Sequence, residues 1–150
     1  MNWIEYIQPQ RMTTNDLLSR KRIQCSFVEE LDESYDILVR STRRQIELYR
    51  KENIPLMIKV DALNTRYDAL IRKKKQQRYE TSDKIDDILD QMIQIRQQIA
   101  THSGYEHFAA YQFDAYGRFD YTQSDVDKFH TGIQKIVVPM LSHLHKERKI

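Results

Sequence analysis

The sequence predicts an all-α protein, a bundle of four to five helices with long amphipathic helices and a short aromatic helix before the last one. Glycine and proline are rare, at three residues each in 150, so most of the chain can form regular structure. Apolar residues make up 40% and charged residues 31%, a balance typical of helical bundles. Over most of the chain the apolar residues recur three or four positions apart, which is the period of one helix face.

The N-terminal third is expected to form an arm followed by a long helix. Residues 1–13 are expected to be extended or to form a single turn whose aromatic residues dock on the bundle. Residues 14–16 then offer a helix N-cap, and an amphipathic helix is predicted over residues 14–51. Its apolar pattern weakens between Leu18 and Phe27, which indicates a break, and Thr42 occupies a position that faces inward.

Two further helices carry regular apolar stripes. The first begins at Pro55, a residue suited to a first helical turn, and ends in a basic cluster at residues 72–75. That cluster is read as a complement to the helix dipole in preference to a phosphate-binding patch. The second helix follows a cap at residues 81–83. We interpret the acidic residues of its first half as a complement to the helix dipole and not as a metal site. The two stripes consist of Leu56, Val60, Leu63, Tyr67 and Leu70, and of Ile85, Ile88, Met92, Ile95 and Ile99.

Two glycines bound the aromatic segment. Gly104 is expected to end the preceding helix and Gly117 to turn the chain into the last one, because glycine adopts positive φ at little cost. Thr122 and Asp125 are close to a capping box for a helix over residues 123–149, and Pro139 predicts a kink near residues 135–139. Four aromatic residues of this region have two interpretations, the wall of a peptide groove or core at a helix crossing: Phe108, Tyr111, Tyr116 and Tyr121.

The last 70 residues resemble a known family. The zinc oligopeptidases of the oligoendopeptidase F (thimet-like) type contain a passage similar to Ile99-Ala100 … Gly104-Tyr105-Glu106-His107-Phe108 … Tyr111 … Gly117-Arg118-Phe119-Asp120-Tyr121-Thr122, followed by Val137-Val138-Pro139 and Glu147-Arg148-Lys149. The resemblance implies a helix, a short helix and a further helix that lead toward a catalytic zinc region. Residues 52–70 bear a weaker likeness to an earlier helix of the family.

The chain departs from that family in its chemistry. The family acts through H-E-x-x-H on a helix, in which two histidines hold zinc and the glutamate activates water. This motif is absent from the 150 residues, and the spacing of the five histidines cannot imitate it. We therefore expect no catalytic, cofactor-binding or metal-binding residue and no hydrolysis by this chain alone, although zinc is the cofactor of the family it resembles.

These observations predict a single helical domain over residues 1–150, with the arm at 1–13, a weakly matching helical pair at 14–78 and the oligoendopeptidase F-like segment at 79–150. The expected function is that of a truncated or fragmentary oligoendopeptidase F-like protein. It would supply helical scaffold and peptide-channel wall, with a peptide or a complementary catalytic segment as partner. The alternative is a free-standing helical interaction module that forms a homodimer through its apolar stripes.

Charge, hydropathy and cysteine content indicate the expected partners and location of the protein. A net charge of +2 argues against nucleic acid as a partner, and the sequence contains no apolar run long enough to span a membrane. A single cysteine, Cys25, suits a reducing compartment, so a cytoplasmic location is expected.

Overall fold

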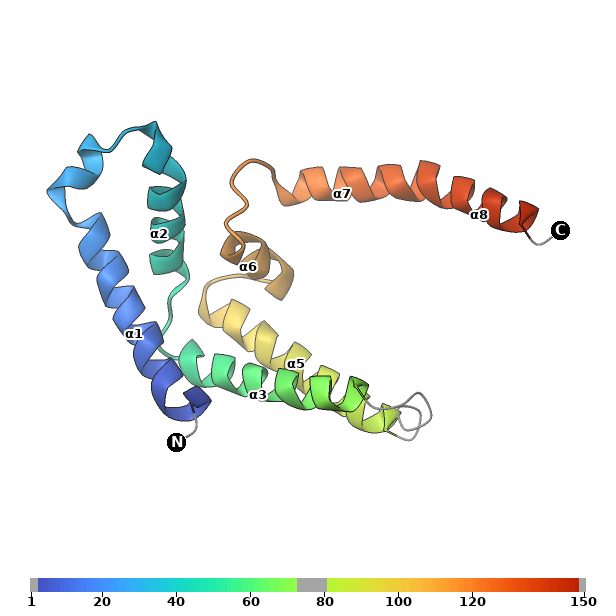
Figure 1. Cartoon of the computed structure of the whole chain (residues 1–150), viewed down its shortest axis with the longest axis horizontal. Helices are drawn as coiled ribbons and strands as arrows, with labels where there is room; N and C mark the ends of the chain where they lie inside the picture. Colours follow the sequence, from blue (N-terminus) through green and yellow to red (C-terminus); the bar gives the residue numbers. More distant parts are fainter. Residues whose placement is uncertain (1–2, 73–80, 149–150) are drawn as a thin grey trace. The chain divides into compact units, whose positions relative to one another are not determined.

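The structure is a computed structural model that describes residues 3–72 and 81–148, and every regular element in these ranges is helical (Figure 1). The all-α prediction is thus confirmed. The chain forms two compact units, Met1–Ala115 and Tyr116–Ile150. The elements of the first are α1 (Trp3–Ile23), two 3₁₀ turns (Ser26–Glu30 and Glu33–Tyr35), α2 (Asp36–Leu48), α3 (Asn53–Ile71), α5 (Ser82–His102) and α6 (Phe108–Ala115). Those of the second are α7 (Gln123–Gly132), a π-helical turn (Ile133–Val137) and α8 (Val138–Glu147).

The N-terminal segment is helical, so the extended arm expected over residues 1–13 is wrong, and the caps expected at residues 14–16 lie inside a helix. Helix α1 continues through Pro9 and packs against both α2 and α3. The side chain of Gln8 on α1 donates to Asp61 Oδ2 on α3 at 2.6 Å. Tertiary packing of this kind outweighs the backbone hydrogen bond that Pro9 cannot make.

The helix predicted over residues 14–51 is two helices. Helix α1 ends at Ile23 and α2 begins at Asp36, so the break extends further along the chain than the weak stretch that predicted it. The Asp32 carboxylate accepts a hydrogen bond from the backbone N–H of Ser34 at 2.8 Å and stabilises the second 3₁₀ turn. Thr42 faces inward as predicted, and its hydroxyl donates to the Leu38 carbonyl oxygen at 2.7 Å.

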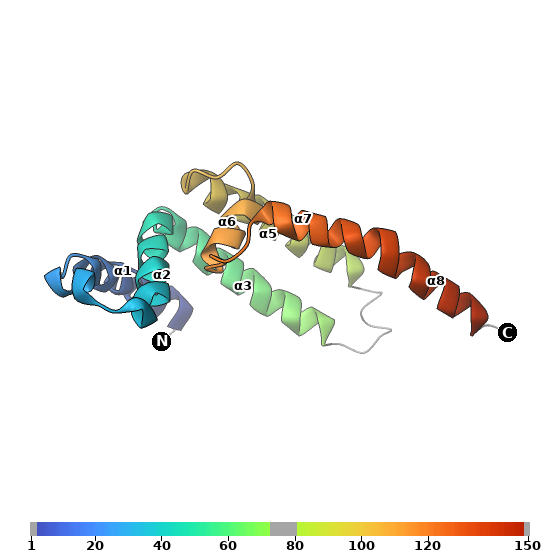
Figure 2. The same cartoon turned by 90° about the horizontal axis from the view of Figure 1, so that it is seen from above.

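The core of the first unit lies where the two predicted stripes meet. Helices α3 and α5 lie side by side in both views (Figures 1 and 2) and form the most extensive pair among the described helices. Each buried aliphatic side chain in such a seam contributes about 1.5–3 kcal/mol. The core cluster consists of Leu48, Val60, Leu63, Ile88, Met92, Ile95, Ile99, Ala100 and Tyr111.

The two glycines act as predicted. Gly104 has a φ of 88° and Gly117 a φ of 64°, both in the left-handed region. After α5 the backbone N–H of Tyr105 donates to the Ala100 carbonyl oxygen at 2.9 Å, and that of Gly104 donates to Thr101 at 3.0 Å. This pair of bonds is the Schellman motif, and it satisfies carbonyl groups that the end of a helix leaves open.

The second unit contains one long interrupted helix. The predicted capping box is present, because Thr122 Oγ1 accepts from the N–H of Asp125 at 3.3 Å and Asp125 Oδ2 accepts from the N–H of Thr122 at 3.0 Å. A kink is predicted near residues 135–139, and the structure has a π-helical turn at Ile133–Val137, in which the N–H of Val138 donates to the Ile133 carbonyl oxygen. Proline cannot donate, so a wider turn before it rearranges the hydrogen bonds without ending the helix.

Two expectations remain, one on membrane spans and one on the basic cluster after α3. Over residues 3–72 and 81–148, no helix combines the length and apolar character that crossing a membrane requires. Residues 73–75, most of the basic cluster after α3, lie outside the described residues.

Candidate functional site: the aromatic segment and its polar network

The start of α6 is held by a side chain of α5. Gln97 Oε1 accepts a hydrogen bond from the backbone N–H of Phe108 at 3.3 Å, and Gln97 Nε2 donates to the Glu106 carbonyl oxygen at 2.6 Å. The first N–H groups of a helix have no partner within the helix, so one amide side chain satisfies such a group and fixes the approach of the chain. The aromatic residues of α6 therefore have a defined position against α5.

Phe108 and Tyr111 belong to this packed region. Tyr111 is 6% exposed, and its ring centroid lies 5.8 Å from that of Phe108 and 5.7 Å from that of Tyr105, the latter pair edge to face. The Arg96 guanidinium lies 5.6 Å from the centroid of the Phe108 ring. Burial raises the pKa of Tyr111, so its phenol stays neutral at physiological pH and cannot serve as a base.

Tyr116 and Tyr121 lie in the second unit and are more accessible. Tyr116 is 64% exposed and Tyr121 is 44% exposed. The Arg118 guanidinium lies 4.9 Å from the first ring centroid and 5.9 Å from the second, within the range of cation–π attraction. The four aromatic residues selected from the sequence therefore fall into two separate sets, a packed pair in the first unit and an accessible pair around Arg118 in the second.

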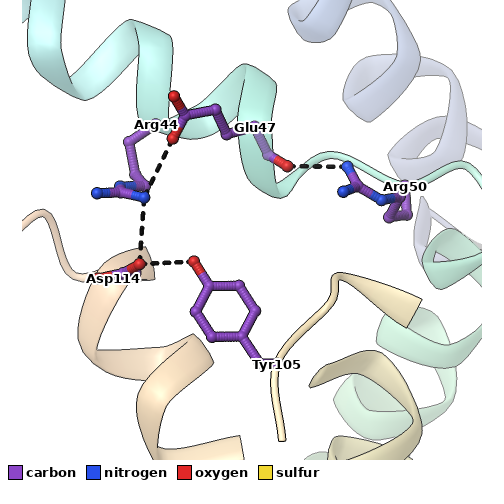
Figure 3. A network of polar contacts seen from close by, with 5 residues as sticks. All are labelled: Arg44, Glu47, Arg50, Tyr105 and Asp114. Carbon is purple, nitrogen blue, oxygen red and sulfur yellow. Dashed lines mark hydrogen bonds and ion pairs between the residues drawn. The ribbon is translucent and has the colours of Figure 1, made fainter. Parts of the chain in front are cut away.

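A polar network joins α2 to α6 (Figure 3). Asp114 Oδ2 lies 3.1 Å from Arg44 Nη1 and accepts a hydrogen bond from the Tyr105 hydroxyl at 2.5 Å. Arg44 Nη1 also lies 3.1 Å from Glu47 Oε2. Burial, followed by the hydrogen bond to Asp114, raises the pKa of Tyr105 to about 12, and the nearby Arg44 opposes this shift in part.

The network is built to hold two helices together. Its acidic groups contact Arg44 and the Tyr105 hydroxyl, so it consists of ion pairs and a hydrogen bond among α2, α6 and the segment before α6. Arg50 closes the end of α2 nearby, because its Nη1 donates to the carbonyl oxygens of Glu47 and Tyr49, each at 2.8 Å.

Asn53 is a structural residue that reasoning from the sequence missed. It is fully buried, and its Nδ2 donates to the Ile99 carbonyl oxygen and to Ser103 Oγ, both at 3.0 Å. Its Oδ1 lies 2.8 Å from His102 Nδ1. Because Oδ1 is an acceptor, His102 carries its proton on Nδ1 in this contact. A signal existed: counting back three positions from Leu56 extends the α3 stripe to residue 53.

The described residues do not fit a zinc ion. Over 3–72 and 81–148, no three histidine, cysteine or acidic side chains come together as metal ligands. His107 Nε2 lies 3.4 Å from Glu106 and His143 Nε2 lies 3.2 Å from Glu147, which are neighbours on their own segments. These two histidines therefore face a single acidic side chain each, whereas a catalytic zinc ion requires three protein ligands.

Comparison with known proteins gives a likeness of fold. No protein-family profile matches the sequence, and no curated protein matches it. A crystal structure assigned as an oligoendopeptidase F, from Bacillus anthracis str. Ames, is similar with a TM-score of 0.84 over 97% of this chain, at 18% sequence identity. The match covers 33% of that protein, so the present chain spans about a third of its length. The fold resembles that of the helical portion of an oligoendopeptidase F.

Proposed function

We propose that this chain is a helical scaffold of the oligoendopeptidase F type, which supplies wall to a peptide-binding channel and does not hydrolyse peptides by itself. The observation that carries this proposal is the likeness of fold over 97% of the chain to one third of an oligoendopeptidase F. The 150 residues contain no H-E-x-x-H motif, so zinc and its ligands would come from a separate polypeptide segment.

The accessible aromatic pair is the part of the chain best suited to contact a peptide. Tyr116 and Tyr121 are accessible, and the Arg118 guanidinium lies 4.9 Å and 5.9 Å from their ring centroids, so this group of side chains combines apolar area, hydroxyl groups and a cation at the surface. Phe108 and Tyr111 have a supporting role in this proposal, since both pack into the core of the first unit. The single and exposed Cys25 is compatible with the reducing cytoplasm as the place where the protein works.

The first experiment measures hydrolysis and zinc binding. The purified chain is incubated with zinc and a quenched fluorescent peptide, and bound zinc is measured by equilibrium dialysis. We expect no turnover and no stoichiometric zinc. A Leu63→Asp variant, which disrupts the core but is purified identically, reports contaminating peptidase. Turnover that requires the native chain and is abolished by a chelator would contradict the proposal.

The second experiment measures peptide binding by nuclear magnetic resonance titration with a short unstructured peptide. Tyr116→Ala and Tyr121→Ala are expected to weaken binding, while Tyr6→Ala on α1 is the matched control. Tyr6 is 57% exposed, so it is as accessible as the two residues tested. If the peptide does not bind, or if all three variants weaken it equally, the channel-wall role is wrong.

A further inference from the structure

The helix of the second unit carries an apolar line that no element of that unit buries. Steps of three or four residues place six side chains on one side of it, in the order Val126, Phe129, Ile133, Val137, Leu141 and Leu144. None of the described residues from Gln123 to Glu147 is buried. Three of the six are exposed, Phe129 at 66%, Leu141 at 45% and Leu144 at 46%, and the other three, Val126, Ile133 and Val137, are half-buried. Water therefore contacts apolar side chains whose burial the hydrophobic effect favours.

The π-turn keeps this line straight. The three central steps, from Phe129 to Leu141, are each four residues long, and four residues exceed one turn of an α-helix. A stripe with such steps drifts around the helix. The wider turn at Ile133–Val137 takes up an additional residue at the midpoint of the line, so its two halves remain on the same side.

The line is also symmetric about its centre. Counted outward from Lys135, Ile133 matches Val137, Phe129 matches Leu141 and Val126 matches Leu144. When two copies of a helix pack antiparallel about a two-fold axis, residues equally distant from the centre face each other. We propose that a second copy of this chain covers the line, through an antiparallel pair of α7–α8 helices.

Charge favours the same orientation. The start of the helix carries Asp125 and Asp127, and its end carries Lys146 and Arg148. Antiparallel packing places each acidic start beside a basic end and opposes the two helix dipoles, whereas parallel packing places like charges together.

Each end also carries one charge of the opposite sign. Lys128 lies 3.3 Å from Asp125, and Glu147 lies 3.2 Å from His143. With these charges counted, the start keeps one net negative charge and the end keeps one net positive charge, so the polarity of the two ends remains. The helix extends over 25 residues, and the line from Val126 to Leu144 covers about 27 Å of its length.

The decisive measurement is the mass of the whole chain by sedimentation equilibrium, with two variants at adjacent positions. We expect the wild type to approach twice its 18.1 kDa mass as concentration rises. Val137→Asp places a carboxylate in the seam and is expected to weaken association by roughly a hundredfold. Ile136→Asp is the matched control, because Ile136 lies in the same π-turn, off the line, and is 70% exposed. Circular dichroism verifies that both variants retain equal helix content.

Orientation is tested by disulfide formation. In a Cys25→Ser background, chains with Phe129→Cys and chains with Leu141→Cys are mixed and oxidised. Antiparallel packing predicts that the mixed disulfide forms ahead of either homodisulfide. The proposal is overturned if the wild type is monomeric at all concentrations or if Ile136→Asp dissociates it as strongly as Val137→Asp. Preferred 129–129 pairing, or a monomer that uses this face to bind a different protein, also overturns it. None of these outcomes bears on the scaffold proposal, whose tests measure peptide binding and hydrolysis.

Discussion

Asn53 in the first turn of α3 and His102 at the end of α5 are joined by a hydrogen bond of 2.8 Å between Asn53 Oδ1 and His102 Nδ1. The same amide donates to Ile99 and Ser103, so one fully buried side chain connects the start of one core helix to the end of the other. The packing of α3 on α5 thus includes a polar contact as well as an apolar seam.

Replacing this amide is expected to destabilise the first unit. Asn53→Leu keeps the approximate shape but leaves the buried Ser103 hydroxyl without the amide donor, at a cost of about 1–3 kcal/mol in the free energy of unfolding. Asn64→Leu makes the same chemical change on the same helix, at a half-buried position, and is expected to cost within about 0.5 kcal/mol. Denaturant unfolding measures both. Equal costs would show that the Asn53 hydrogen bonds contribute nothing.

The ion pair between Arg44 and Asp114 is expected to stabilise the packing of α6 against α2. Both side chains are about one-third exposed, so a double-mutant cycle with alanine should give a coupling energy of about 0.5–1 kcal/mol. The Arg40–Asp36 pair within α2 is the control, because it is longer at 3.3 Å and more exposed. Its coupling should be no more than about 0.5 kcal/mol and should vanish in high salt. Equal coupling energies in the two cycles would contradict the proposed role.

Alkaline pH is expected to destabilise the first unit through Tyr105. Its pKa is about 12 in the folded chain, above the ordinary value of 10.0, so the unfolded chain loses the phenolic proton first. The contribution to stability is fully present below pH 10 and is lost as pH rises from 10 toward 12. Tyr105→Phe should make this loss less steep, as measured by thermal melts across the range. An unchanged slope would mean that Tyr105 titrates normally.

Two glycines should respond to alanine with opposite signs. At Gly104 an added Cβ meets no atom within 4 Å, yet the φ of 88° is unfavourable for alanine, so Gly104→Ala should cost roughly 1–2 kcal/mol. At Gly132 the space is also open and the backbone is helical, so Gly132→Ala should stabilise the helix by up to about 1 kcal/mol. Circular dichroism melts of the two variants provide the comparison. Effects of the same sign would contradict the reason given for Gly104.

Local patterns predicted the elements whose causes are themselves local. The glycine ends at residues 104 and 117 and the Thr122–Asp125 capping box depend on residues within a few positions of one another, and the structure contains each of them. The stripe of α3 and that of α5 likewise became the two sides of the core, because a three-four spacing defines a helix face whatever it packs against.

Contacts between distant segments decided the rest. Residues 3–13 are helical because α1 packs on α3, as the bond from Gln8 to Asp61 illustrates, and no pattern in those residues indicates it. The ion pair between Arg44 and Asp114 also depends on which helices meet. The same is true of the division of the four aromatic residues into two sets. The sequence by itself determined the end of α5, the start of α7 and the apolar faces of α3 and α5. The tertiary structure alone decided which polar groups are buried together, since that depends on residues 46 to 70 positions apart whose proximity the period of a helix does not encode.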